Sequence, residues 1–82
     1  MQKRYRKITP VIEAMQYDGD NRDEITKFTR GKANYSDFWE RFQLYDSRNI
    51  FIGDWVLKFN KDEYLCITDE RFRSEYLEVQ DG

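Results

Sequence analysis

The sequence predicts a small α+β domain in which a mainly antiparallel β-sheet packs with one or two short helices. Apolar residues alternate with polar ones in several short segments, which is typical of strands. Most of these segments are joined by loops too short for a crossover, which favours antiparallel pairing. At 82 residues, the chain has the length of one domain over residues 1–82, with residues 1–7 as a basic arm.

The first predicted strand covers residues 11–17 and follows the single proline, Pro10. Proline suits the start of a strand or a sheet edge because it has no N–H to donate. In this strand Val11, Met15 and Tyr17 share one side, with Glu13 as the exception. We therefore expect Glu13 at the rim of the sheet or paired with an arginine.

A short helix is predicted over residues 22–30, after a turn-rich cluster. Asn21 is the predicted N-cap, with Glu24 three residues later to complete a capping box. Gly31 is placed to end the helix in a left-handed conformation. The residues that share one face of this helix are Ile25 and Phe28. A helix this short needs tertiary packing, so this face is expected to dock on the sheet.

Residues 32–41 allow two interpretations. The segment Ser36–Glu40 opens one helical turn or forms an aromatic-rich loop. After it, residues 41–45 alternate and predict a short strand, and residues 46–49 predict a turn.

The strongest β pattern runs from Ile50 to Thr68. Its first part leads into Gly53-Asp54, where we expect Gly53 to supply a bulge or a turn with positive φ and the Asp54 side chain to close it. The side chains predicted to share one face of the next strand are Trp55, Leu57 and Phe59. A polar loop of hairpin length, residues 60–63, then connects to a return strand over residues 64–67.

The end of the chain predicts a second short helix and a closing strand. Thr68 is the expected helix cap, Phe72 the anchor of the helical turn, and residues 76–79 the strand. The complete predicted order is β-α-β-β-β-α-β.

The composition argues against most catalytic chemistry. Histidine is absent, which removes Ser-His-Asp and Cys-His pairs and zinc sites built on histidine. Cys66 is the single cysteine and is expected to fill a small core space on a strand. The acidic turn before the first helix lacks the spacing of a calcium loop. We therefore predict a protein that is not an enzyme and that needs neither a metal nor a cofactor.

Charge is distributed unevenly along the chain. Four basic residues and no acidic one occur in residues 1–12, which leaves ten basic and sixteen acidic residues, a balance of −6, for the rest. The basic residues of the arm are Lys3, Arg4, Arg6 and Lys7. They are candidates for contact with an anion or a nucleic acid, although the acidic remainder makes a nucleic-acid partner the weaker hypothesis.

Aromatic residues are the most informative feature, with six Phe, six Tyr and two Trp. A core this small is not expected to bury them all. The candidates for exposure are Tyr5, Tyr35, Phe38, Trp39, Tyr45 and Tyr64. Tyr, Trp and Arg dominate binding hot spots, and the predicted partner-binding patch is Tyr35, Phe38, Trp39 and Arg41. The competing interpretation is that Phe38, Trp39 and Phe42 cover one end of the sheet.

Two stretches of the sequence resemble a family of small phage and prophage proteins. Members open with a basic arm and a "PVVIEA" strand followed by "QW" or "QY", and residues 10–17 match this opening. They continue to a "PGDYII" hairpin, an aromatic-Cys strand and an "F…Y" segment, matched here by residues 53–57, 63–66 and 72–76. Ile52 stands where the family has proline, and residues 32–49 match no pattern. The resemblance implies phage origin and an intracellular site of action, and it transfers no catalytic residue.

These observations lead to three functional hypotheses. The first is a non-enzymatic phage accessory protein that binds and inhibits or redirects a host factor, such as a defence enzyme, in the bacterial cytoplasm. The second is a homo-oligomeric sponge that sequesters a small anionic nucleotide between subunits. The third is nucleic-acid contact through the basic arm. No apolar run has the length of a membrane span or of a signal peptide, so no membrane partner is expected.

Overall fold

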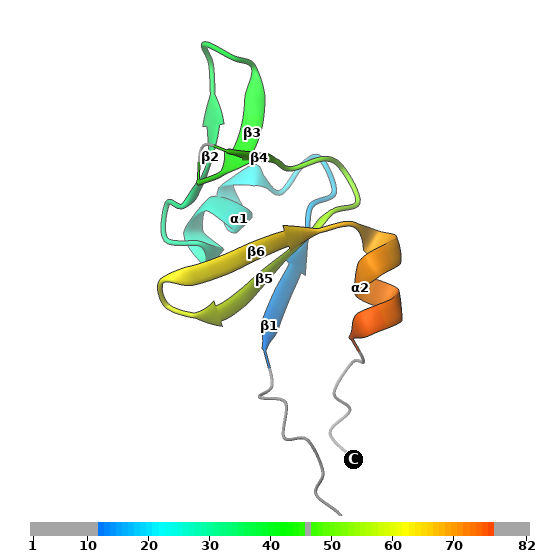
Figure 1. Ribbon diagram of the computed structural model, residues 1–82. Coiled ribbons are helices and arrows are strands. Elements are labelled where there is room, and N and C mark those ends of the chain that lie inside the picture. Colours follow the sequence, from blue (N-terminus) through cyan, green and yellow to red (C-terminus); the bar gives the residue numbers. More distant parts are fainter. Residues whose placement is uncertain (1–11, 46, 77–82) are drawn as a thin grey trace, which may run out of the picture.

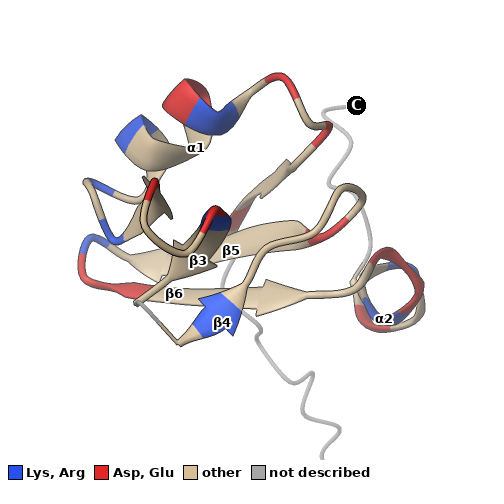
Figure 2. Cartoon of the chain, turned by 90° about the horizontal axis from the view of Figure 1, so that it is seen from above, with Lys and Arg blue, Asp and Glu red and all other residues tan. Residues whose placement is uncertain are grey.

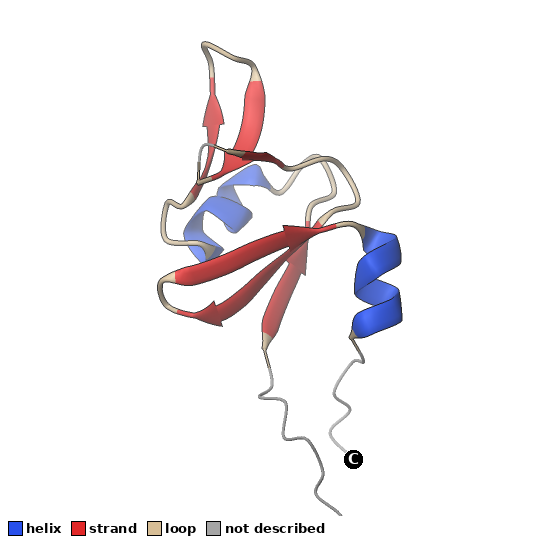
Figure 3. Ribbon diagram, viewed as in Figure 1, coloured by secondary structure: helices blue, strands red, loops and turns tan. Residues whose placement is uncertain are grey.

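The computed structural model describes residues 12–45 and 47–76. Within these residues, six strands and two helices follow one another in the order β1-α1-β2-β3-β4-β5-β6-α2 (Figure 1). The strands form two antiparallel sheets of three strands each, in the orders β1-β5-β6 and β2-β3-β4. The predicted α+β class is therefore confirmed, although the β residues divide into two sheets (Figure 3).

The first sheet is built from β1 (Glu13–Gln16), β5 (Trp55–Asn60) and β6 (Glu63–Ile67). Its register places Met15 opposite Val56 and Val56 opposite Cys66. These partners lie on one face of the sheet, because side chains alternate between faces along each strand.

The second sheet contains β2 (Ala33–Ser36), β3 (Arg41–Leu44) and β4 (Arg48–Asn49). The sequence interpretation missed two of these strands. Residues 33–36, in the segment left open, form β2 because pairing with β3 satisfies their backbone groups. Residues 37–40 form a loop, which was one of the two alternatives for Ser36–Glu40. The turn expected over residues 46–49 contains the two-residue strand β4.

The core lies between the first sheet, helix α1 (Arg22–Phe28) and the second sheet. Its members are Tyr17, Ile25, Ala33, Phe42, Leu44, Ile50, Val56, Tyr64 and Cys66, with Met15 and Phe28 packed against them. Ile25 is completely buried, so the apolar face predicted for the first helix does dock as expected.

The helix ends of α1 differ partly from the expectation. Asn21 does not cap the helix with its side chain, so the predicted capping box with Glu24 is wrong. Instead the Asn21 amide bridges the preceding turn, accepting from the Asp18 N–H and donating to the Gln16 carbonyl. Gly31 has the positive φ expected of it. Arg30 directly before it also has a positive φ, so the left-handed conformation after the helix begins at Arg30 and not at Gly31.

Helix α2 (Asp69–Glu75) packs beside the first sheet through aromatic stacking. Thr68 caps it as predicted, accepting from the Arg71 N–H. The Phe72 ring stacks on Trp55 with centroids 3.9 Å apart, and Tyr76 stacks on Phe72. The Trp55 indole N–H donates to Asp69 at 2.9 Å, and this hydrogen bond, together with one from Arg73, lowers the pKa of the Asp69 carboxyl.

Three further expectations have clear outcomes. Glu13 is exposed at the rim, and its ion-pair partner is Lys58 rather than an arginine, at 3.9 Å. Residues 50–52, expected to extend the strand before Gly53, lie outside any strand. Tyr76 of the expected closing strand follows α2 in no strand, and residues 77–79 lie outside the described residues.

Candidate functional site

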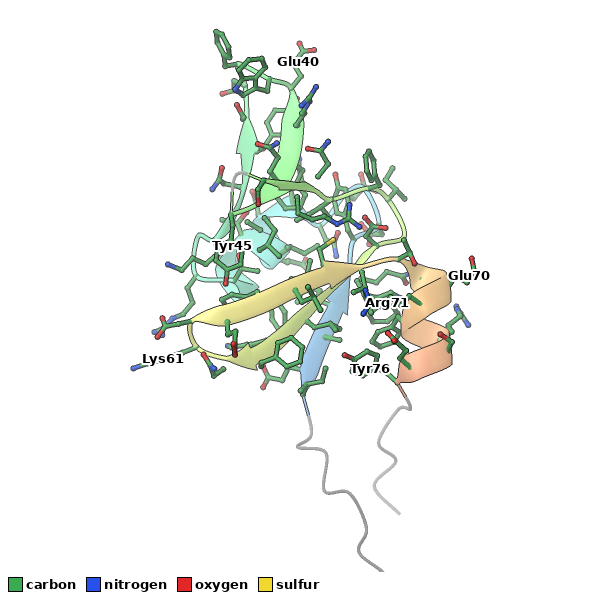
Figure 4. All side chains as sticks on the ribbon, in the orientation of Figure 1. Glu40, Tyr45, Lys61, Glu70, Arg71 and Tyr76 are labelled. Carbon is green, nitrogen blue, oxygen red and sulfur yellow. The ribbon has the colours of Figure 1, made fainter. Side chains whose placement is uncertain are left out.

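The β2–β3 hairpin projects away from the core of the molecule (Figure 1). Ser36 and Arg41 are its last paired residues, so its loop contains the four residues 37–40. Glu40 adopts a left-handed conformation with φ 52°, and the Ser36 hydroxyl accepts from the Trp39 N–H at 3.2 Å. These features close the loop, and Figure 4 shows Glu40 at the outer end of the hairpin.

Two aromatic side chains occupy this loop and are exposed to solvent. Phe38 is 83% exposed and Trp39 is 62% exposed. Their rings contact each other edge to face, with centroids 4.7 Å apart and an interplanar angle of 85°. The interpretation in which these two residues cover the end of a sheet is therefore wrong, because they lie beyond the last paired residues of the hairpin. We call Phe38 and Trp39 the aromatic tip.

The other two residues of the predicted patch lie on opposite faces of the hairpin. Tyr35 is paired with Phe42 and shares its face, whereas Arg41 is paired with Ser36 on the other face. Tyr35 is 41% exposed, and the Arg22 guanidinium lies 4.1 Å from its ring centroid. The structure thus brings Phe38 and Trp39 together, while Tyr35 and Arg41 flank them from two sides.

The remaining predicted aromatics divide between the surface and the core. Tyr45 is 44% exposed, as expected. Tyr64, expected at the surface, is buried, because its ring packs with Phe28 on the core side of β6. Phe42 is also buried, 5.0 Å from the Tyr17 ring. Tyr5 and the basic residues Lys3, Arg4, Arg6 and Lys7 lie outside the described residues.

Cys66 lies in the core beside a buried carboxylate. Its thiol approaches Asp54 Oδ2 at 3.7 Å, and the same oxygen lies 3.6 Å from Arg48 and accepts from the Phe51 N–H at 3.0 Å. Burial raises the pKa of Cys66 to about 12, against the opposing effect of Arg48. A thiol with this pKa stays protonated at neutral pH and is a weak nucleophile, which fits the packing role predicted for it.

The sequence interpretation also missed exposed apolar residues outside the β2–β3 hairpin, of which Phe51 and Ile52 are the most exposed, at 60% and 73%. These two lie in the connection between β4 and β5 (Figure 1). Aromatic and β-branched residues such as Phe51 and Ile52 are common in strands. For that reason the sequence interpretation placed them in a strand and did not predict that they are exposed. The signal that could have revealed it is Gly53-Asp54 directly after them, since a turn there removes both residues from the sheet.

Comparison with known proteins adds no relative. No known protein family, curated protein or solved structure matches this chain. In the described part of the chain, neither helix has the length and apolar character needed to cross a membrane. Among residues 12–45 and 47–76, no three His, Cys, Asp or Glu side chains are grouped to hold a metal ion.

Proposed function

We propose that this protein is a non-enzymatic phage accessory protein that binds a protein of the bacterial host and inhibits or redirects it. The aromatic tip is the contact that anchors the partner. The observation that carries the proposal is the exposure of Phe38 and Trp39 on a projecting hairpin. The sequence resemblance to small phage proteins supplies the setting, and the tip lies in the segment without a family match.

Exposed aromatic side chains are unfavourable in water, and burying one in a partner contributes about 1.5–3 kcal/mol. The two rings already contact each other in the unbound protein, so little side-chain freedom is lost when a partner covers them. Residues of this kind, and Trp above all, form the hot spots of protein interfaces.

The test is affinity capture from host lysate with three forms of the protein. Wild type is compared with Phe38→Ala/Trp39→Ala and with Lys61→Ala/Asp62→Ala, which alters the turn of the β5–β6 hairpin instead. We expect wild type and the Lys61/Asp62 variant to retain the same host protein, and the tip variant to lose it by at least about 100-fold in affinity. Equal capture by all three forms would remove the tip from consideration.

The two other hypotheses predict different results in the same preparation. A nucleotide sponge requires an oligomer in native mass spectrometry and a thermal shift with one member of a cyclic-nucleotide panel. Contact through Lys3, Arg4, Arg6 and Lys7 requires nucleic-acid binding that falls steeply as salt rises. Either result, combined with no captured host protein, would replace the proposal.

A further inference from the structure

The connection from β4 to β5 contains a rigid turn formed by residues 51–54. The Asp54 N–H donates to the Phe51 carbonyl at 2.9 Å, and Gly53 has φ 99°, which defines a type II turn. The turn is fixed to the end of β1 at two points, because the Gly53 N–H donates to the Tyr17 carbonyl at 2.7 Å and Tyr17 donates back to the Asp54 carbonyl. The Asp54 side chain closes the turn from within through the Phe51 N–H.

This rigid turn displays two large apolar side chains. Ile52 occupies its second position, which proline suits because that position needs φ near −60°. An exposed isoleucine there contributes nothing to the turn conformation. Its side chain lies over Gly19, where a Cβ atom would come within 3.1 Å of Ile52 Cδ1. Phe51 and Ile52 are therefore held in place while most of their surface remains in water, a feature typical of contact sites.

The turn lies beside the base of the β2–β3 hairpin. The Ile50 N–H donates to the Phe42 carbonyl at 2.7 Å, which ties the start of the connection to β3. In Figure 1 the hairpin and the turn both lie above the first sheet, on the side away from the end of β1 at Glu13. Trp39 is three residues from Phe42, and Phe51 directly follows the Ile50 that is bonded to Phe42. The two features are therefore within the span of one protein interface of standard size.

Acidic side chains flank both features. Asp37 and Glu40 flank the aromatic tip, and Asp18 and Asp20 flank Gly19, on which Ile52 lies. Seen from this end, red segments mark both the hairpin loop and the loop before α1 (Figure 2). The cations nearby are Arg41, the Arg22 held over Tyr35, and the Arg48 held by Asp54.

We propose that Phe51 and Ile52 form one footprint with the aromatic tip, and that this footprint fits a protein whose apolar pockets are bordered by lysine or arginine. The inference rests on the proposed function and specifies its partner. Phosphates of nucleic acids and anionic lipid headgroups carry the same charge as the four carboxylates, so this chemistry favours a cationic protein surface.

The test titrates wild type and variants with the purified host protein obtained by capture. Ile52→Pro keeps the turn, since proline suits that position, and removes the apolar side chain. We expect it to weaken binding about tenfold, and Phe51→Ala/Ile52→Pro to weaken it further. The matched control is Leu65→Ala, which truncates another exposed apolar residue, on β6, and should leave the affinity unchanged. Urea unfolding of each variant checks that the fold is retained.

The outcomes separate this inference from the proposed function. If the Phe38→Ala/Trp39→Ala variant loses the partner and Ile52→Pro binds as wild type does, the shared footprint is wrong and the proposed function stands. If no host protein is captured, or the tip variant binds normally, both fail.

The charge argument has its own test in Asp20→Lys and Asp37→Lys. Each should weaken binding several-fold at low salt, with a smaller effect at high salt. Tighter binding by either variant would contradict the inference that lysine or arginine borders the partner's apolar pockets. Tighter binding of wild type to phosphatidylserine vesicles or a single-stranded oligonucleotide than to the captured protein would overturn it as well.

Discussion

The β2–β3 and β5–β6 hairpins are built alike but differ in what their turns expose to solvent. The β5–β6 hairpin packs on the core on the side of Val56 and contacts α2 through Trp55 on the other side, where Phe59 and Leu65 stay 43% and 40% exposed. Its turn is polar, and Asn60 Oδ1 accepts from the Asp62 N–H at 2.9 Å. The β2–β3 hairpin buries only its base, with Phe42 and Leu44 in the core and the aromatic tip exposed.

The difference shows what a hairpin turn requires in this fold. Asn60, Lys61 and Asp62 close the β5–β6 turn with polar groups alone. The β2–β3 loop is closed in a similar way, by the left-handed backbone of Glu40 and by the Ser36 hydroxyl, which accepts from the Trp39 N–H. Neither turn needs a large apolar side chain, so the presence of Phe38 and Trp39 is better explained by a partner than by folding.

The largest effect is expected at the buried base of the β2–β3 hairpin. Phe42→Ala should lower the free energy of unfolding by about 3–5 kcal/mol, because it removes a ring packed in the core and leaves a cavity. Since native proteins are stable by only about 5–15 kcal/mol, a large fraction of the stability would be lost. Urea unfolding followed by circular dichroism measures this, with Phe42→Leu as a milder control. A loss below 1 kcal/mol would contradict the assigned core.

A smaller effect is expected where the two hairpins meet. The Tyr45 hydroxyl accepts from the Tyr64 N–H and donates to the Asp62 carbonyl, both at 3.1 Å. Tyr45→Phe removes both hydrogen bonds and should cost about 1–2 kcal/mol of unfolding free energy. Tyr35→Phe is the control, since Tyr35 is engaged through its ring face by Arg22. Equal stability of Tyr45→Phe and wild type would show that this link does not stabilise the fold.

A gain is expected at the loop of the projecting hairpin. Glu40 has φ 52°, a region that glycine enters without the steric cost of a Cβ atom. Glu40→Gly should therefore raise the free energy of unfolding by about 0.5–1 kcal/mol, seen as a rise of a few degrees in Tm. Glu40→Ala, which keeps the Cβ atom, should give no such gain. A lower Tm for the glycine variant would mean that the Glu40 side chain stabilises the loop.

The sequence predicted the regular parts of this fold better than its surface. Residues 55–59 and 64–67 alternate clearly, and Ile25 with Phe28 marks the buried face of α1, so these elements were found. Strand β2 was missed because Asn34 and Ser36 carry little β preference, and its existence depends on pairing with β3 across the hairpin loop.

The candidate site was predicted only in part for a related physical reason. A short aromatic run is compatible with both a core and an exposed patch, and only tertiary structure distinguishes them. Phe42 belongs to the core, whereas Phe38 and Trp39, a few residues earlier, are exposed. Phe51 and Ile52 were assigned to a strand because large apolar side chains are typical of a buried strand. The turn that exposes them depends on hydrogen bonds with Tyr17, which is distant in the sequence.

The central claim is that Phe38 and Trp39 contribute to binding and not to folding. Its most direct test is the free energy of unfolding of Phe38→Ser/Trp39→Ser, measured in urea by circular dichroism so that the lost indole does not affect the signal. The account predicts a value within about 1 kcal/mol of wild type, as for exposed residues in general. A loss of about 3 kcal/mol or more, comparable to that of Phe42→Ala, would show that the aromatic tip is part of the folded core and would contradict the account.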